Sequence, residues 1–358
     1  MSNSFDPVKL ARADLKGMEP YDAYYAPGII RMDANENPHD FPPEVKEYMY
    51  SQMGPQFFGR YPDAMARELV NDLATFFGVG TENIMVGNGS DELILNIMLA
   101  FGVGRKVHIA SPTFSMYGIH ARVAGAMPVN VPRDQYFRVD VEAMISSALE
   151  EPSVIIICNP NNPTGTETST DDIAAIAEAT NSLVVVDEAY IEFGGQSCIP
   201  LLDKHPNLLV MRTFSKAFGL AGMRVGYLLA SPKVVKELLR IKQPFNVNSF
   251  SQLAARSVLK FRNLFQDRIV IIMNDRIKLD QNLREIPGVS VYPTVANFLF
   301  FSTVAPASEV YRYLLEEGVM VRFIGVPGRG DYLRVSVGTE SENTFFIDKL
   351  KSVLMSKF

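Results

Sequence analysis

The chain has 358 residues, of which 47% are hydrophobic, so it is long enough to bury a large core without disulfides or a structural metal. Lys and Arg total 34 against 40 Asp and Glu, a formal net charge of −6, which argues against nucleic acid as a partner. The two cysteines, Cys158 and Cys198, lack a metal-binding spacing, and no apolar run approaches the roughly 18 residues of a membrane helix, so we expect a soluble, cytoplasmic protein with no metal site and no membrane partner.

The N-terminal part of the chain differs in composition from the rest. Residues 1–44 are rich in Pro, Tyr and Asn, and we expect them to form an arm that returns to one of the domains. We predict a large cofactor-binding domain at residues 45–245 and a small C-terminal domain at residues 246–358, which begins with an interdomain helix.

Short apolar runs alternate with helical patterns in the large domain. The predicted strands are 84–87, 106–110, 153–158, 183–187 and 208–213. Runs that are apolar at every position are typical of strands covered on both faces, which predicts an α/β fold with a mostly parallel sheet. The helices between them follow from apolar residues spaced three and four apart, and Ser169 or Thr170 is placed to cap one of them.

After Pro232 the pattern changes to longer helices and fewer strands. A helix is predicted over 234–241, and a long helix over about 249–283 would suit a bridge between the domains. Further on, strands at 297–302 and 332–337 and helices at 307–317 and 341–355 predict a smaller α+β domain.

Lys216 is the most informative residue of the chain. It lies in RTFSKAFGLAGMRVGY, just after an apolar strand, among small, hydroxyl and aromatic residues and near Arg224. Desolvation and a nearby cation both disfavour the ammonium form, and this is what a lysine that forms a Schiff base requires. Thr213, Ser215 and Arg224 offer two hydroxyls and a cation that are suited to holding a phosphate.

Two other segments place polar groups at strand ends. Asp187 opens DEAYIEF directly after a strand, where it could hold a protonated pyridine nitrogen, and Tyr190 could reach the same ligand. Asn162 lies in the rigid turn NPNNPTG, again after a strand, and can aim an amide at a ring oxygen.

The segment GNGSDEL lies between a strand and a helix. Gly89, Ser90 and Asp91 would present backbone N–H groups at a helix N-terminus, which is a site for a phosphate. The segment lacks the Walker lysine and the GxGxxG spacing, so it indicates neither an ATPase nor a dinucleotide-binding fold.

Taken in order, these segments resemble the fold-type I aminotransferases, which use pyridoxal 5′-phosphate, and are most similar to the histidinol-phosphate aminotransferase family. DANENP (33–38), RYPD (60–63), SPTFSMY (111–117) and YLRVSVGT (332–339) extend the resemblance over nearly the whole chain. It implies transamination of L-histidinol phosphate with 2-oxoglutarate by a homodimer.

The resemblance also implies a role for each matching residue. Lys216 would bind the cofactor covalently and move the proton, Asp187 would pair with the pyridinium nitrogen, and Tyr190 and Asn162 would bond the phenolic oxygen. The residues expected at the cofactor phosphate are Gly89, Ser90, Asp91, Thr213, Ser215 and Arg224. Phe114 stands where the family commonly has a tyrosine stacked on the ring, and Tyr61 is similar to the tyrosine that reaches in from the second subunit. The residues expected at the substrate are Arg334, Arg322, Tyr21 and Asn35.

Four other functions remain open on the sequence. An aromatic amino-acid aminotransferase would share the same scaffold, and a decarboxylase of phosphorylated amino acids would need no 2-oxoglutarate. A cofactor-sensing regulator would require a DNA-binding region, and residues 1–44 hold neither a helix-turn-helix pattern nor a basic cluster. A protein that kept the fold and lost the chemistry would not need the reactive positions that this chain has.

Overall fold

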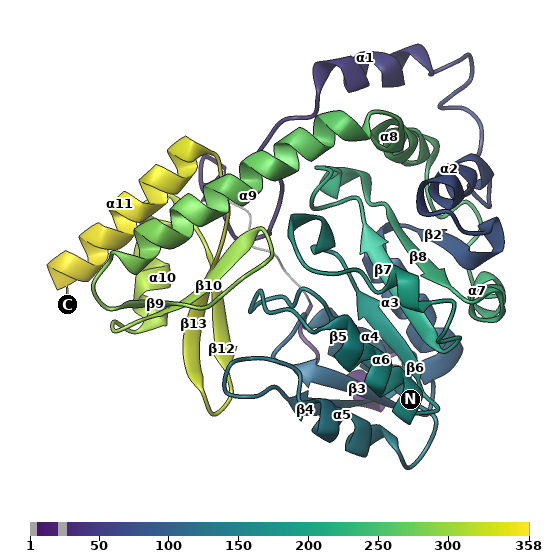
Figure 1. Ribbon diagram of the computed structural model, residues 1–358, viewed down its shortest axis with the longest axis horizontal. Coiled ribbons are helices and arrows are strands. Elements are labelled where there is room, and N and C mark those ends of the chain that lie inside the picture. The colour runs from purple at the N-terminus through teal and green to yellow at the C-terminus, as the bar shows by residue number, and fades with distance from the viewer. Residues whose placement is uncertain (1–5, 21–26, 358) are drawn as a thin grey trace, which may run out of the picture.

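The computed structural model describes residues 6–20 and 27–357, which form two separate layered units joined by a long helix (Figure 1). The larger unit contains a seven-stranded sheet in the order β2-β8-β7-β6-β5-β3-β4. Its strands are β2 (Ile84–Gly87), β3 (Lys106–Ser111), β4 (Met127–Pro132), β5 (Val154–Cys158), β6 (Leu183–Asp187), β7 (Leu208–Thr213) and β8 (Gly226–Ala230). Pairs from β4 through β7 are parallel, and β8 is antiparallel to both β7 and β2.

The prediction of a mostly parallel sheet covered by helices is confirmed. Every residue of β5 and β7 is buried, as expected for strands with helices on both faces. Two strands of this seven-stranded sheet were not predicted. β4 is an edge strand with two prolines and mixed exposure, and β8 follows a glycine-rich segment, so neither gives an uninterrupted apolar run bounded by turns.

Helices cover both faces of this sheet. On one face α3 (Gly89–Ile97), α4 (Met116–Ala124) and α7 (Pro232–Leu239) bury their apolar sides against the strands. On the other face lie α5 (Val141–Ala148) and α6 (Thr170–Ala179). The predicted cap of α6 is confirmed, because the Ser169 hydroxyl accepts from Asp172 N at 3.1 Å.

The smaller unit is an antiparallel sheet in the order β12-β13-β10-β9, flanked by helices (Figure 1). Its strands are β9 (Val289–Val291), β10 (Phe298–Thr303), β12 (Arg322–Val326) and β13 (Gly330–Ser336), and its helices are α10 (Ala307–Glu316) and α11 (Glu340–Lys357). Both predicted strands and both predicted helices of this part begin and end within two residues of these bounds. The separation of residues 45–245 from 246–358 as domains stays a prediction.

The predicted long helix over 249–283 is wrong in one respect, because it is two helices. α8 (Ser249–Lys260) and α9 (Arg262–Arg284) meet at Phe261, whose φ of −105° and ψ of 28° leave the helical region. The Phe261 ring packs edge-on against Tyr48, with centroids 5.2 Å apart. The break lets α8 stay packed on α2 (Arg67–Phe77) while α9 leads to the smaller sheet. The helical spacing of apolar residues continues across Phe261, so the sequence gives no sign of the break.

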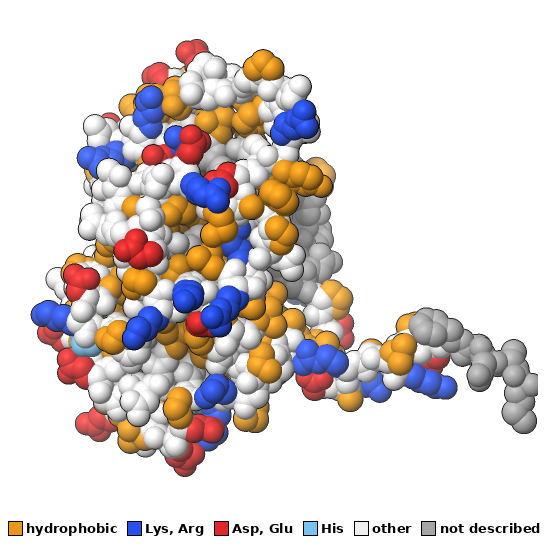
Figure 2. Space-filling view, turned by 90° about the vertical axis from the view of Figure 1, so that its right-hand side faces the viewer, with side chains coloured by type: hydrophobic (Ala, Val, Ile, Leu, Met, Phe, Trp, Pro, Cys, Tyr) orange, Lys and Arg blue, Asp and Glu red, His pale blue; other side chains and the backbone are white. Residues whose placement is uncertain are grey.

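The described part of the N-terminal arm makes contacts with both units. β1 (Ile30–Arg31) pairs in parallel with β11 (Val319–Met320), and α1 (Pro43–Ser51) packs on α8. Earlier, Arg12 donates to the carbonyl oxygens of Arg122 and Val123 at the end of α4, and residues 6–11, which are exposed, project from the body of the molecule (Figure 2). Across residues 6–20 and 27–357, no helix is long and apolar enough to cross a membrane.

Candidate active site

Lys216 lies in the loop after β7, at the carboxyl edge of the parallel strands. Its Nζ donates to the Ala34 carbonyl oxygen at 2.7 Å and lies 5.9 Å from the centroid of the Tyr190 ring. The side chain is partly buried. Desolvation, followed by the positive charge of Arg334, lowers the pKa of the ammonium to about 8. A usable share of the amine is therefore neutral, and so nucleophilic, at physiological pH.

Asp187 ends β6, next to β7 in the sheet, and is buried. Its Oδ2 accepts from the Tyr117 hydroxyl at 2.7 Å, and its Oδ1 accepts from Ala189 N at 3.1 Å. Burial raises the pKa of the carboxyl to about 6, against the opposing effect of these two hydrogen bonds. The protein thus holds a carboxylate where a cationic ring nitrogen would relieve the cost of burial.

A hydrogen-bonded chain joins the loops after β5 and β6 to the smaller sheet. The Tyr190 hydroxyl accepts from Asn35 Nδ2 at 3.0 Å and from Asn162 Nδ2 at 3.4 Å. Arg334 on β13 donates through Nη1 to Asn162 Oδ1 and through Nη2 to the Asp33 carbonyl oxygen. Burial raises the pKa of Tyr190 above its ordinary value, so the phenol stays protonated and can donate to a ligand oxygen.

The residues expected at a phosphate lie around the start of α3. Gly89 has φ of +76°, and a Cβ on it would lie 2.7 Å from Arg224 Nη2, so only glycine lets the backbone approach this guanidinium. Arg224 in turn donates to Asp91 Oδ2 at 3.0 Å.

The end of β7 lies next to the start of α3, because β8, which pairs with β7, also approaches α3 closely. Thr213 pairs with Gly226 across β7 and β8, and a Cβ on Gly226 would lie 2.6 Å from Ser90 N. The Thr213 hydroxyl donates to Ser215 Oγ at 3.0 Å and accepts from Ser215 N at 3.1 Å. Two hydroxyls, an arginine and a helix N-terminus therefore come from three different segments to one place.

Four further residues were predicted for the site, and the structure describes three of them. Phe114 is partly buried and packs its ring edge-on against Tyr117, with centroids 5.6 Å apart. Arg322 pairs with Arg334 across β12 and β13, so both side chains extend from the same face of the smaller sheet. Tyr61 is 82% exposed and stacks on Phe245 rather than joining the Lys216 cluster of its own chain. Tyr21 lies outside the described residues.

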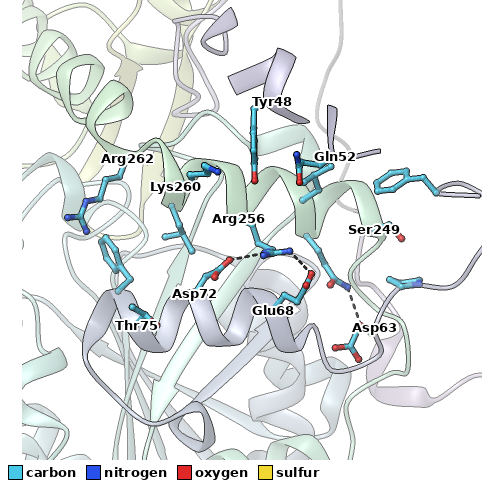
Figure 3. Close-up of a pocket in the computed structure, with 16 residues that line it drawn as sticks. Tyr48, Gln52, Asp63, Glu68, Asp72, Thr75, Ser249, Arg256, Lys260 and Arg262 are labelled. Carbon is cyan, nitrogen blue, oxygen red and sulfur yellow. Dashed lines mark hydrogen bonds and ion pairs between the residues drawn. The ribbon is translucent and has the colours of Figure 1, made fainter. Parts of the chain in front are cut away.

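A pocket of about 850 Å³ lies between α2 and α8, away from these residues (Figure 3). Arg256 spans it, donating to Glu68 and to Asp72 Oδ2, so its charges are already paired within the chain (Figure 3). A volume of this size alone does not mark a reactive site, and the described residues that line this pocket include no cysteine or histidine.

The cluster around Lys216 fits pyridoxal 5′-phosphate, the cofactor that the family resemblance implies. An amine with a lowered pKa suits the aldehyde, and the buried carboxylate of Asp187 suits the ring nitrogen. The close approach at Gly89, which a Cβ would fill, suits a phosphate. Among the described residues, no group of three or more His, Cys, Asp or Glu side chains could hold a metal ion.

Sequence reasoning missed several residues that complete this site. Tyr117 bonds Asp187, and its signal was available, because it closes the motif SPTFSMY three residues after Phe114. Arg212 and Glu188 form a buried ion pair, with Arg212 Nη2 2.8 Å from Glu188 Oε2, between the ends of β7 and β6. The Ala34 carbonyl oxygen that accepts from Lys216 comes from 182 residues away, and no local pattern indicates it.

Comparisons with known sequences match this chain to aminotransferases. The family model described as aminotransferase class I and II matches residues 27–350. The histidinol-phosphate aminotransferase of Thermoanaerobacter sp. (strain X514) is 40% identical over 349 residues, which is 97% of this chain and 99% of the relative. The histidinol-phosphate aminotransferase 1 of Carboxydothermus hydrogenoformans is 42% identical over 349 residues, which is 97% of this chain and 98% of the relative.

Solved structures agree with these matches. The crystal structure of histidinol-phosphate aminotransferase from Sinorhizobium meliloti in complex with pyridoxal-5′-phosphate is similar with a TM-score of 0.85 and 26% sequence identity. The similarity covers 92% of this chain and 91% of that chain.

Proposed function

The chain belongs to the aminotransferase class I and II family, and from that premise we propose that it transfers an amino group between L-histidinol phosphate and 2-oxoglutarate. The products are imidazole acetol phosphate and glutamate, and the reaction is a step of histidine biosynthesis. The observation that carries the proposal is the convergence of Lys216, Asp187 and Arg334 at one edge of the sheet. The family predicted from the sequence motifs is confirmed by the matches.

Pyridoxal 5′-phosphate supplies the chemistry that the protein lacks, because its ring takes up the electron pair of the substrate's Cα–H bond. Lys216 would hold the aldehyde carbon through its amine, and Asp187 would hold the proton on the ring nitrogen. Tyr190 and Asn162 would orient the phenolic oxygen, since the Tyr190 hydroxyl already accepts from the Asn162 amide. Phe114 would cover the ring face, which needs only an aromatic surface.

Lys216 would also move the proton during turnover. With its amine free, Nζ would take the proton from the substrate Cα and hold it for return to the substrate–cofactor pair. This requires a neutral amine at working pH, and desolvation together with Arg334 favours that form. The lysine is thus suited to act first as nucleophile and then as base.

Two arginines would serve the two substrates. The site must accept a carboxylate from glutamate in one half-reaction and a phosphate from histidinol phosphate in the other. Arg334 and Arg322 lie directly opposite each other on β13 and β12, so one antiparallel pair presents both guanidinium groups. Asn35, held by its contact to Tyr190, would border the same space.

A screen of half-reactions tests the proposed substrate. The holoenzyme is mixed with histidinol phosphate, glutamate, phenylalanine and a phosphorylated amino acid in turn, and conversion of the bound cofactor to its amine form is followed by absorbance. Conversion by histidinol phosphate and glutamate supports the proposal. A much higher kcat/KM for phenylalanine would assign an aromatic aminotransferase, and release of carbon dioxide without 2-oxoglutarate would assign a decarboxylase.

The protein would act in the cytoplasm as a homodimer, in which Tyr61 reaches the active site of the second subunit. Its high exposure in the single chain, next to Pro62 and Asp63 at the pocket of Figure 3, supports this role. Light scattering should report a dimer, and mixing Lys216→Ala with Tyr61→Ala subunits should produce hybrid dimers with one intact site. A fully active monomer would contradict the role of Tyr61.

A further inference from the structure

Tyr117 touches two of the residues that are expected to contact the cofactor ring. It is the second residue of α4 and is completely buried. Its hydroxyl donates to Asp187 Oδ2 at 2.7 Å, and its ring meets Phe114 edge-on at an interplanar angle of 85°. One side chain therefore contacts both the residue proposed at the ring nitrogen and the residue proposed at the ring face.

The surroundings of Asp187 leave it few sources of hydrogen bonds. Its other oxygen accepts from Ala189 N, and Cys158, opposite it on β5, is a buried thiol whose pKa burial raises to about 12. Two acidic groups also act on it: Asp91 on α3, and Glu188 directly after β6. Both raise the proton affinity of Asp187, as does burial. The Tyr117 phenol opposes them, and within the described residues it is the side-chain group that hydrogen-bonds this carboxylate.

We propose that Tyr117 is a positioning residue that keeps Asp187 ionised and fixed in orientation, and so controls how strongly the protein binds the pyridine nitrogen of the cofactor. The proposal rests on the proposed pyridoxal phosphate chemistry. A hydrogen bond to a carboxylate favours its charged form, and a charge-assisted bond in a buried site is strong. Without the phenol, nothing in its place opposes the effect of burial and of the acidic neighbours on Asp187. The carboxylate then takes up a proton at a higher pH. The neutral acid no longer pairs with a pyridinium.

The test measures ligand binding by the cofactor-free protein rather than turnover. Pyridoxamine 5′-phosphate is the probe, because it has the same ring and phosphate and cannot bond covalently to Lys216. Its affinity is measured by equilibrium dialysis from pH 5 to pH 9. In Tyr117→Phe we expect about a tenfold or greater loss at pH 7, and the pH below which affinity is lost should rise by about one unit.

Phe114→Leu is the matched control. It removes the aromatic face and leaves the hydrogen bond to Asp187, so it should weaken binding without moving the pH midpoint. In an Asp187→Asn background, adding Tyr117→Phe should change neither the affinity nor its pH dependence further. The proposal is overturned if the pH midpoint of binding is the same in Tyr117→Phe as in the unmodified protein. It is also overturned if Tyr117→Phe weakens binding equally in the presence of Asp187 and in the Asp187→Asn background.

A second variant keeps the test decisive if Tyr117→Phe does not fold. Replacement of Tyr117 by 3-fluorotyrosine preserves the side-chain shape and makes the phenol a stronger donor, so the midpoint should move to lower pH. No movement, or movement to higher pH, counts against the proposal. Absence of probe binding by the unmodified protein would instead refute the proposed cofactor chemistry, so the two failures are distinguishable.

Discussion

The Lys216 amine should react with aldehydes far faster at neutral pH than an exposed lysine does. With a pKa of about 8, about one tenth of the amine is neutral at pH 7. With the ordinary value of 10.5, about one part in 3,000 is neutral, so the reactive fraction differs by about 300-fold. The sign follows from burial and from Arg334, both of which disfavour the ammonium.

The assay is reductive labelling of the cofactor-free protein. Limiting pyridoxal, which lacks the phosphate, is added with cyanoborohydride between pH 6 and pH 11, and the labelled peptides are quantified by mass spectrometry. Labelling of Lys216 should rise with pH and level off above a midpoint near 8. Lys236, which is exposed on α7, is the internal reference in the same sample.

Arg334→Met is the perturbation that tests the cause. Removing this guanidinium removes a positive charge that lowers the pKa of Lys216, so the midpoint should move up toward 10.5 and labelling at pH 7 should fall. The reasoning is refuted if Lys216 and Lys236 are labelled equally at pH 7, or if the Lys216 midpoint is the same with and without Arg334.

Three other predictions concern stability, the phosphate site and the substrate. Glu188→Ala leaves the Arg212 cation buried with a weakened set of partners, so the free energy of unfolding in urea should fall by about 3–5 kcal/mol. Glu237→Ala, which breaks the exposed pair with Arg240, should cost less than about 1 kcal/mol, and equal losses would contradict the argument. Gly226→Ala forces a Cβ to within 2.6 Å of Ser90 N, so affinity for pyridoxamine 5′-phosphate should drop in dialysis, and an unchanged affinity would separate this contact from the phosphate site. Arg322→Ala should lower kcat/KM for histidinol phosphate about tenfold or more with a smaller effect on glutamate, and equal effects on both would remove it from the substrate phosphate.

Much of the larger sheet could be predicted because its signals are local. The strands β5, β6 and β7 are mainly apolar runs that end at polar residues: Asn159 directly follows β5, Asp187 is the last residue of β6, and Thr213 is the last residue of β7. Parallel strands end at one edge of a sheet, so the order of the segments alone places Asp187, Asn162 and Lys216 near one another. The N-cap of α6 at Ser169 was predictable for the same reason, since capping involves residues three apart.

The break at Phe261 could not be predicted in this way. Its residues have helical spacing, and the chain turns there because α8 packs on α2 while α9 packs on the smaller sheet. The surface against which a helix packs is formed by segments that are distant in the sequence, so the helix's own apolar spacing does not show where it ends.

For this protein the sequence alone determined which residues carry reactive groups, which strands bring them to one edge and which family they belong to. The tertiary structure decided how those groups behave. Tyr117 reaches Asp187 across 70 residues, Ala34 accepts from Lys216 across 182 residues, and Arg334 meets Asn162 across 172 residues. The proton affinity of a side chain depends on its desolvation and on charges within a few ångströms, and both arise only when distant segments are packed together.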